Sequence, residues 1–141
     1  MKHLIYFICA VVTALPQCAA GDLNWTVVTL ARDGSLGVAS SNSQPKAIAD
    51  SIKACRAMAD TSNDCGAQFI AAKGSWIIAN LCGDHTLMAT GNSLVEAEQE
   101  ALYREISLQF YVPDLSPCKR VVLVDPIGAL VRSKQNLFTA R

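Results

Sequence analysis

The chain has 141 residues, a formal net charge of zero and two histidines. This length is sufficient for one domain with a hydrophobic core, and the balanced charge provides no field that would attract a nucleic acid. The chain lacks a G-x-S-x-G elbow, a phosphate-binding loop, an H-E-x-x-H motif and a C-x-x-C motif, so we expect neither a cofactor nor a metal ion.

The first twenty residues have the pattern of a signal peptide. A basic start at Lys2 is followed by an uncharged run from residue 4 to 15, and by small residues before Gly21. The run is shorter than the ~20 residues that span a bilayer, and no later segment predicts a transmembrane helix. We expect cleavage after about Ala20 and a secreted or periplasmic protein. The alternatives are a buried N-terminal element and lipidation at Cys18, which Gln17 disfavours.

The next part of the chain, about residues 24–72, predicts a strand, a tight turn, a strand, a helix and a third strand. Trp25 begins the first apolar run, and Asp33-Gly34 suits a hairpin turn because glycine tolerates positive φ. The helix is predicted to start at Ser43, whose side chain can cap it, with Pro45 tolerated in its first turn. Its apolar face is predicted to contain Ile48, Ile52, Cys55 and Ala59.

The same order of features returns about 50 residues later, over about residues 75–125. Trp76 begins the equivalent apolar run, and Gly83-Asp84 occupies the place of the first turn. Ser93 and Glu96 form a capping box at the start of the second helix. The last predicted strand is the apolar run 121–124.

These two units predict an α+β fold. One unit alone has no partner to cover both its sheet and its helix, whereas two packed units cover both. We therefore expect two strand-strand-helix-strand repeats that form one mostly antiparallel sheet, packed by two helices, over residues 21–125. Residues 126–141 are predicted to be a basic C-terminal tail, either solvated or bound to an anionic envelope polymer.

Four of the six cysteines follow the predicted signal peptide: Cys55, Cys65, Cys82 and Cys118. An even number in an exported domain predicts two disulfides, and spacing alone leaves three connectivities open. The repeat places Cys65 and Cys118 at equivalent positions, and Cys55 opposite Glu105. This comparison favours Cys55–Cys65 and Cys82–Cys118.

The doubled Trp…Gly…Ala-x-x-x-Ala-Leu-x-x-Cys…Cys pattern resembles the bacterial exported family called domain of unknown function 4189. The resemblance covers about residues 24–125 and implies a bacterial, extracytoplasmic protein. The family has no established catalytic residues, so the resemblance implies none here. The chain departs from the family pattern at Glu105, which replaces a helix cysteine, and in fewer glycines and aromatic residues after the strands.

Two groups of residues are candidates for catalysis. Cys82, Asp84 and His85 are close in sequence, and a thiolate with a nearby base is a nucleophilic pair. A half-cystine in a turn explains the same residues. The second predicted helix carries a row of carboxylates, which suits either acid/base chemistry or a solvated helix face. These carboxylates are Glu96, Glu98, Glu100 and Glu105.

Aromatic residues are the candidates for partner binding. Trp25 and Trp76 begin equivalent strands, as core anchors or as an exposed platform. Residues 109–117 predict a loop that either presents Phe110 and Tyr111 to a partner or packs as a connector. The favoured interpretation is a non-enzymatic module that binds a partner protein or a surface polymer, as an inhibitor or immunity-like factor. The alternative is a small extracytoplasmic hydrolase that uses Cys82 and His85, or the carboxylates of the second helix.

Overall fold

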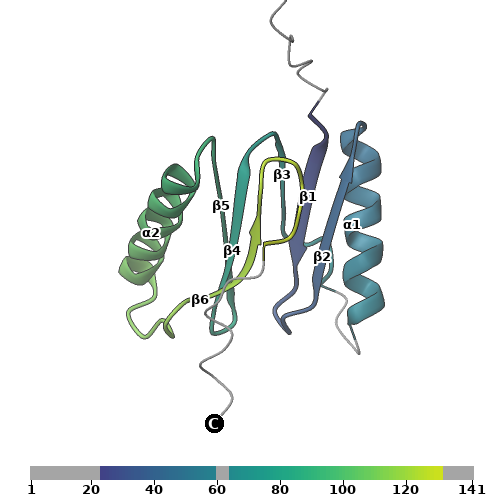
Figure 1. The fold of residues 1–141 in the computed structure, drawn as a ribbon. Helices are drawn as coiled ribbons and strands as arrows, with labels where there is room; N and C mark the ends of the chain where they lie inside the picture. The colour runs from purple at the N-terminus through teal and green to yellow at the C-terminus, as the bar shows by residue number, and fades with distance from the viewer. Residues whose placement is uncertain (1–22, 60–63, 132–141) are drawn as a thin grey trace, which may run out of the picture.

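The computed structural model describes residues 23–59 and 64–131. The predicted signal peptide and the chain from residue 132 onward lie outside the described residues. The described residues form two helices and six strands, which confirms the α+β class, and Figure 1 shows how these elements are arranged. In chain order, the elements are β1 (Trp25–Leu30), β2 (Leu36–Ser41), α1 (Gln44–Met58), β3 (Phe69–Lys73), β4 (Trp76–Cys82), β5 (His85–Gly91), α2 (Leu94–Tyr111) and β6 (Lys119–Val124).

The strands form two separate antiparallel sheets, with the orders β2-β1-β3 and β5-β4-β6. The prediction of one continuous sheet is corrected here. The physical reason is visible in the central strands: Thr26–Leu30 and Ile77–Asn80 are buried at every residue, on both faces. A sheet with helices on one face only would leave alternate residues of these strands in water.

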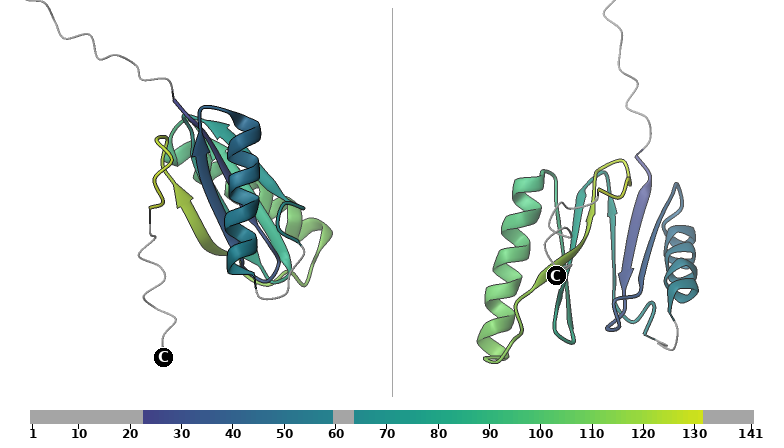
Figure 2. Two further views of the ribbon diagram at one scale, coloured as in Figure 1. Left: turned by 90° about the vertical axis from the view of Figure 1, so that its right-hand side faces the viewer. Right: turned by 60° about the horizontal axis from the view of Figure 1, so that its bottom comes forward.

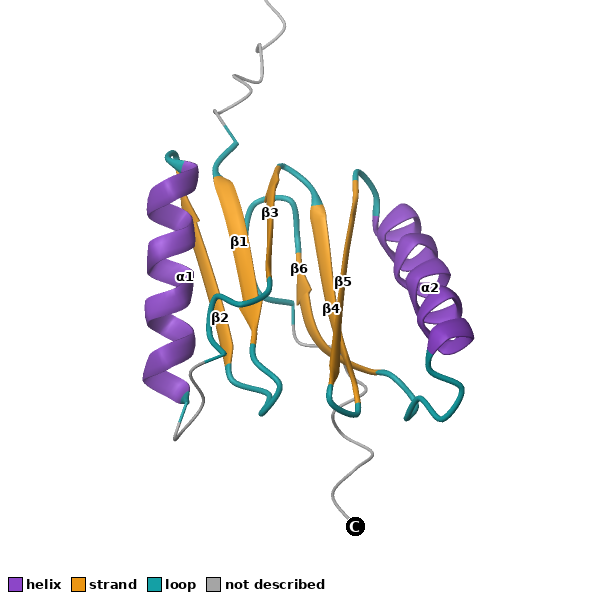
Figure 3. Cartoon of the chain, turned by 180° about the vertical axis from the view of Figure 1, so that it is seen from behind, coloured by secondary structure: helices purple, strands orange, loops and turns teal. Residues whose placement is uncertain are grey.

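The molecule therefore has four layers: helix, sheet, sheet, helix. Val28 and Leu30 of β1 pack between the sheets, against Ile77 and Ala79 of β4. The next residue of β4, Ile78, faces the other way, into a cluster that contains residues of α2. Figures 1 and 3 show the two helices on the outer sides of the sheets, and Figure 2 shows α1 lying over the strands of its own sheet.

Small residues bring each helix close to its sheet. The buried residues of α1 are Ala47, Ser51 and Cys55. Of the predicted stripe, Ile48, Ile52 and Ala59 are only partly buried. The stripe shifts because Gly37 of β2 lies directly under the helix, where an added Cβ would be 1.8 Å from the Ser51 carbonyl oxygen. In α2 the buried residues are Ala97 and Ala101.

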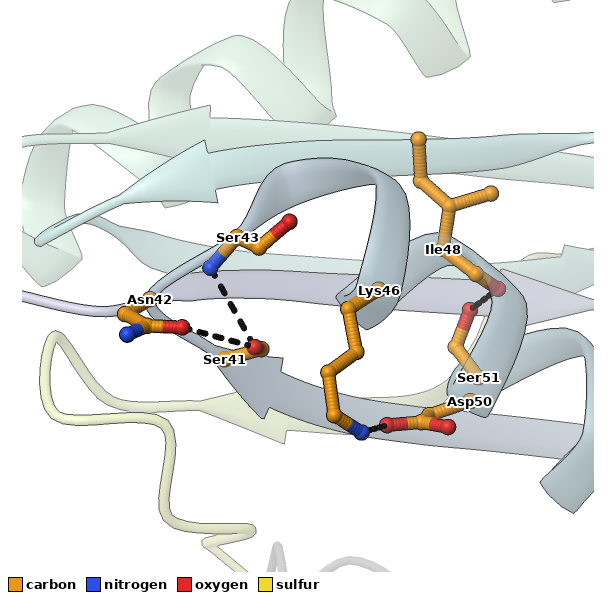
Figure 4. Close-up of polar contacts among 7 residues, drawn as sticks. All are labelled: Ser41, Asn42, Ser43, Lys46, Ile48, Asp50 and Ser51. Atoms are coloured by element: carbon orange, nitrogen blue, oxygen red, sulfur yellow. Dashed lines mark hydrogen bonds and ion pairs between the residues drawn. The ribbon is translucent and has the colours of Figure 1, made fainter.

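The two helices start differently. In α2, Ser93 Oγ accepts a hydrogen bond from the Glu96 amide at 3.2 Å, and the Glu96 carboxylate accepts one from the Asn92 amide at 2.9 Å. This arrangement confirms the predicted capping interaction of Ser93 with Glu96. In α1, Ser43 occupies the N-cap position, but its side chain makes no capping hydrogen bond. Instead its amide donates to Ser41 Oγ at 3.2 Å, as Figure 4 shows.

The two disulfides confirm the pairing favoured by the sequence. Cys55–Cys65 joins the last turn of α1 to the segment before β3, and Cys82–Cys118 joins the end of β4 to the segment before β6.

The chain after β6 turns back onto the domain, as the yellow segment in Figure 1 shows. The Asp125 carboxylate accepts hydrogen bonds from the amides of Ile127 and Ala129, and the Val131 amide donates to the Leu123 carbonyl at 2.7 Å. Residues 126–131, predicted to begin the tail, are thus packed against the domain. Among the described residues, neither helix is long and apolar enough to cross a membrane.

Candidate interaction surface on helix α2

The predicted Cys82 and His85 pair lies at the β4–β5 turn. Cys82 is fully buried and its sulfur is bonded to Cys118, so this disulfide form contains no thiolate at that position. His85 is exposed at the start of β5. Both residues border a cavity of about 250 Å³, which is also lined by Gly83, Asp84, Val112, Asp114, Leu115 and Ser116. Its groups offer hydrogen bonds but no activated nucleophile.

Three of the four predicted carboxylates of α2 form structural contacts, whereas Glu105 is half-buried and forms none among the described residues. Glu98 is paired with Arg120 at 3.0 Å, and Glu100 with Arg104 at 2.7 Å. Glu96 belongs to the cap described above. Arg104 also donates to the Met88 carbonyl at 2.7 Å, which ties α2 to β5. The described residues contain no cluster of three or more side chains suited to holding a metal ion.

The two tryptophans are half-buried at the first positions of β1 and β4. Trp76 packs against the apolar cluster between its sheet and α2. Trp25 pairs across the sheet with Ser41 and Lys73. These positions fit core anchors better than an exposed aromatic platform.

Phe110 and Tyr111 are on the surface, but not in a loop. Helix α2 continues through Tyr111, so the predicted loop over residues 109–117 begins only at Val112. The helix ends there because Pro113 disfavours a helical conformation at the residue before it. Phe110 and Tyr111 are 82% and 80% exposed, with their rings edge to face at 5.5 Å.

The last turn of α2 continues into an apolar ridge along its solvent face. Five large side chains, 58% to 82% exposed, project away from the sheet. A helix with this spacing places them opposite Ala97 and Ala101, which face the sheet. We call this surface the α2 ridge; it consists of Val95, Leu102, Tyr103, Ile106 and Phe110.

The solvent face of α1 has the opposite chemistry. Its exposed residues include Lys46, Lys53 and Arg56, and Lys46 forms an ion pair with Asp50 that is visible in Figure 4. A charged outer face is the usual one for a helix that covers a sheet. The apolar outer face of α2 is therefore a property of this one helix rather than of the architecture.

The size of the α2 ridge also fits a site of association. Two aromatic side chains of about 200 Å² and three smaller aliphatic ones, 58% to 82% exposed, give an exposed apolar area on the order of 500 Å². The largest apolar patch of an ordinary monomer is about 300–600 Å² and is often functional, so the ridge lies in the upper half of that range.

The sequence contained a signal for this surface. Val95, Leu102 and Ile106 follow helical spacing, in parallel with the shorter series Ala97 and Ala101. The carboxylates between them in the sequence indicate a charged face instead, which obscures this apolar series.

No protein-family model, curated protein or solved structure matches this chain. The evidence for the function of the ridge is therefore the chemistry of its own side chains.

Proposed function

We propose that this protein is an exported, non-enzymatic interaction module that binds a protein partner through the α2 ridge. The single observation that carries this proposal is the exposure of five large apolar side chains on a helix whose sheet-facing side is already packed. An apolar ridge favours a protein surface over a polysaccharide, whose hydroxyl groups require polar contacts.

Export is part of the same proposal. It is supported by the signal-like residues 1–20 and by two disulfides, which persist in oxidising compartments. The resemblance to domain of unknown function 4189 supports a bacterial, periplasmic or secreted protein. An inhibitor or immunity-like role is the finer form of the proposal, and it is supported by the small disulfide-bonded scaffold and the absence of the catalytic motifs named above. Edman sequencing of the exported protein is expected to begin at Gly21. Recovery of uncleaved protein in the cytoplasm would contradict the export proposal.

We also propose that the two halves are an internal repeat. The support is their common element order, strand-strand-helix-strand, and the central position of the first strand in each sheet. In this alignment Ala49 of α1 corresponds to Gln99, which lies between Val95 and Leu102 of the ridge on α2. Both are exposed, which makes Ala49 a matched control site for changes on α2.

The binding proposal is tested by affinity capture from periplasm and culture medium. The wild-type protein and Ala49→Glu are expected to retain the same partner, whereas Ile106→Glu is expected to lose it. Circular dichroism of each variant checks that the fold is intact. Equal recovery with Ile106→Glu would exclude the ridge as the binding surface. Recovery of no partner, together with hydrolytic turnover that requires His85, would instead favour the enzyme alternative.

A further inference from the structure

The residues of the α2 ridge have the spacing of a helix-packing seam. Positions 95, 99, 102, 106 and 110 follow one another at intervals of three or four along the helix. This spacing is that of residues which interdigitate with a second helix. Gln99 is the polar member of the seam and is exposed, as its neighbours are. A single polar residue within such a seam commonly fixes the register of the pair.

From this seam we infer that the partner of the α2 ridge is α2 of a second copy of this chain, packed antiparallel across a two-fold axis. This inference names the partner of the surface proposed above and so rests on the proposed function. A two-fold contact requires a surface that is complementary to itself. The ridge meets that requirement in its charge, its geometry and its area.

Three of the four carboxylates of α2 are engaged within one chain, and the fourth, Glu105, is half-buried and has no such contact among the described residues. Glu98 and Glu100 are each paired with an arginine, and Glu96 is bonded to the Asn92 amide. Two copies therefore meet without strong repulsion between rows of bare carboxylates. A basic groove on another protein would find few free acids here. An anionic lipid surface would find no lysine on α2, and Arg104, the one basic residue of this helix, is already engaged.

The geometry is symmetric about the middle of the ridge. Val95 and Phe110 lie at its ends, about 22 Å apart along the helix axis at 1.5 Å per residue. The midpoint falls between Leu102 and Tyr103. An antiparallel second copy centred there places its small Val95 against the large exposed Phe110 of the first. The helix dipoles then oppose each other, which favours this direction over a parallel pair.

The area places the dimer among small, reversible complexes. Burial of about 500 Å² from each copy gives about 1,000 Å² in total, the lower limit for a specific interface. A reversible dimer with a dissociation constant on the order of 10 μM is expected from such a contact. The dimer is thus populated at high local concentration and separates on dilution.

Sedimentation velocity of the exported, oxidised protein tests the inference over a concentration range centred on about 10 μM. The wild type is expected to shift from one-chain to two-chain mass. Leu102→Glu, at the centre, is expected to weaken association at least ~10-fold, as hot-spot residues do. Ala49→Glu adds the same charge to the outer face of α1 and is expected to associate like the wild type. Unchanged association of Leu102→Glu would overturn the inference.

Tyrosine crosslinking reports the orientation. After removal of residues 1–20 the chain retains two tyrosines, Tyr103 near the centre of the ridge and Tyr111 at its end. Photo-oxidation followed by peptide mapping is expected to give a crosslink between Tyr103 of one copy and Tyr103 of the other. A Tyr111–Tyr111 crosslink would overturn the antiparallel arrangement.

The failure of this inference is distinguishable from failure of the proposed function. A wild-type protein that stays monomeric at every concentration overturns self-association. If that monomer still captures an exported partner and Ile106→Glu does not, the ridge binds a different protein and the proposed function stands. If it captures none, both proposals fail.

Discussion

The approach of α1 to its sheet depends on one glycine, and its replacement is expected to have a large effect. In Gly37→Ala the new Cβ would lie 1.8 Å from the Ser51 carbonyl oxygen and 2.8 Å from the Cys55 nitrogen. Both atoms belong to the helix backbone, so no side-chain rotation relieves the contact. Ordinary contact of about 3.4 Å requires the helix to move away by roughly 1.6 Å, which loosens the close packing of the interior.

This movement would loosen the packing of Ala47, Ser51 and Cys55 against β1 and β2. Overpacking in a well-filled interior typically lowers the free energy of unfolding by about 1–3 kcal/mol. The new Cβ is fixed to the strand backbone and meets the helix backbone, so neither side can adjust easily and we expect a loss of about 3 kcal/mol. Urea unfolding followed by tryptophan fluorescence, with disulfides intact, measures the change. The control is Gly34→Ala: no atom lies within 4 Å of its Cβ, so only its positive φ contributes, about 1 kcal/mol. A Gly37→Ala protein within about 0.5 kcal/mol of the wild type would refute the reasoning.

Three other predictions follow from local contacts. Ser93→Ala is expected to lower the free energy of unfolding by about 1 kcal/mol, whereas Ser43→Ala changes it by only a few tenths, because only Ser93 caps its helix; equal losses in urea titrations would contradict this. Removal of Cys82–Cys118 is expected to cost about 4 kcal/mol and removal of Cys55–Cys65 about 3 kcal/mol, since their sequence separations are 36 and 10 residues; the reverse order in denaturation curves would count against the chain-entropy account. Iodoacetamide is expected to leave native, unreduced Cys82 unmodified, as measured by mass spectrometry. The His85→Ala variant is expected to fold normally, and no hydrolytic turnover is expected to depend on His85. Rapid alkylation of Cys82 would support the hydrolase alternative instead.

The features that the sequence predicted well are those decided by neighbouring residues. The Gly34 turn has positive φ because the hairpin requires it, and Ser93 and Glu96 are close enough to form the cap within one turn of chain. The cysteine pairing was also predicted correctly, because the comparison of the two halves favoured the arrangement that the structure shows. The predicted side-chain cap at Ser43 is wrong. The Ser41 hydroxyl accepts a hydrogen bond from the Ser43 amide, and the Ser43 side chain makes no capping hydrogen bond.

The number of sheets was harder to predict from the sequence, because it depends on which strand faces, far apart in the sequence, pack against each other. Strands β1 and β4 carry apolar residues on both faces, which indicates cover on both sides but not what provides it. In the structure the second sheet provides it, through contacts such as those of Val28 and Leu30 with Ile77. A prediction of one sheet satisfied the pairing within each half and missed this contact between halves.

The two helices separate what the fold requires from what it leaves free. Their sheet-facing sides are alike: small residues, with Ala47 in α1 and Ala97 in α2 fully buried. Gly91 lies against Ala97 much as Gly37 lies against Ser51, so both helices are held close by the same device. Nothing in this packing determines the outer faces, because substitutions there leave the core untouched.

The residues on the outer faces of the helices are therefore set by requirements other than folding. On α1 the exposed Lys53 and Arg56 keep the surface hydrated. On α2 the corresponding face exposes Tyr103 and Ile106, which belong to none of the buried apolar clusters of the single chain. Exposed apolar side chains carry a risk of aggregation, so a cluster of five on one helix is best explained by a contact that covers them. Substitutions on the ridge are therefore expected to change association while the four layers remain packed, so binding and stability can be measured separately there.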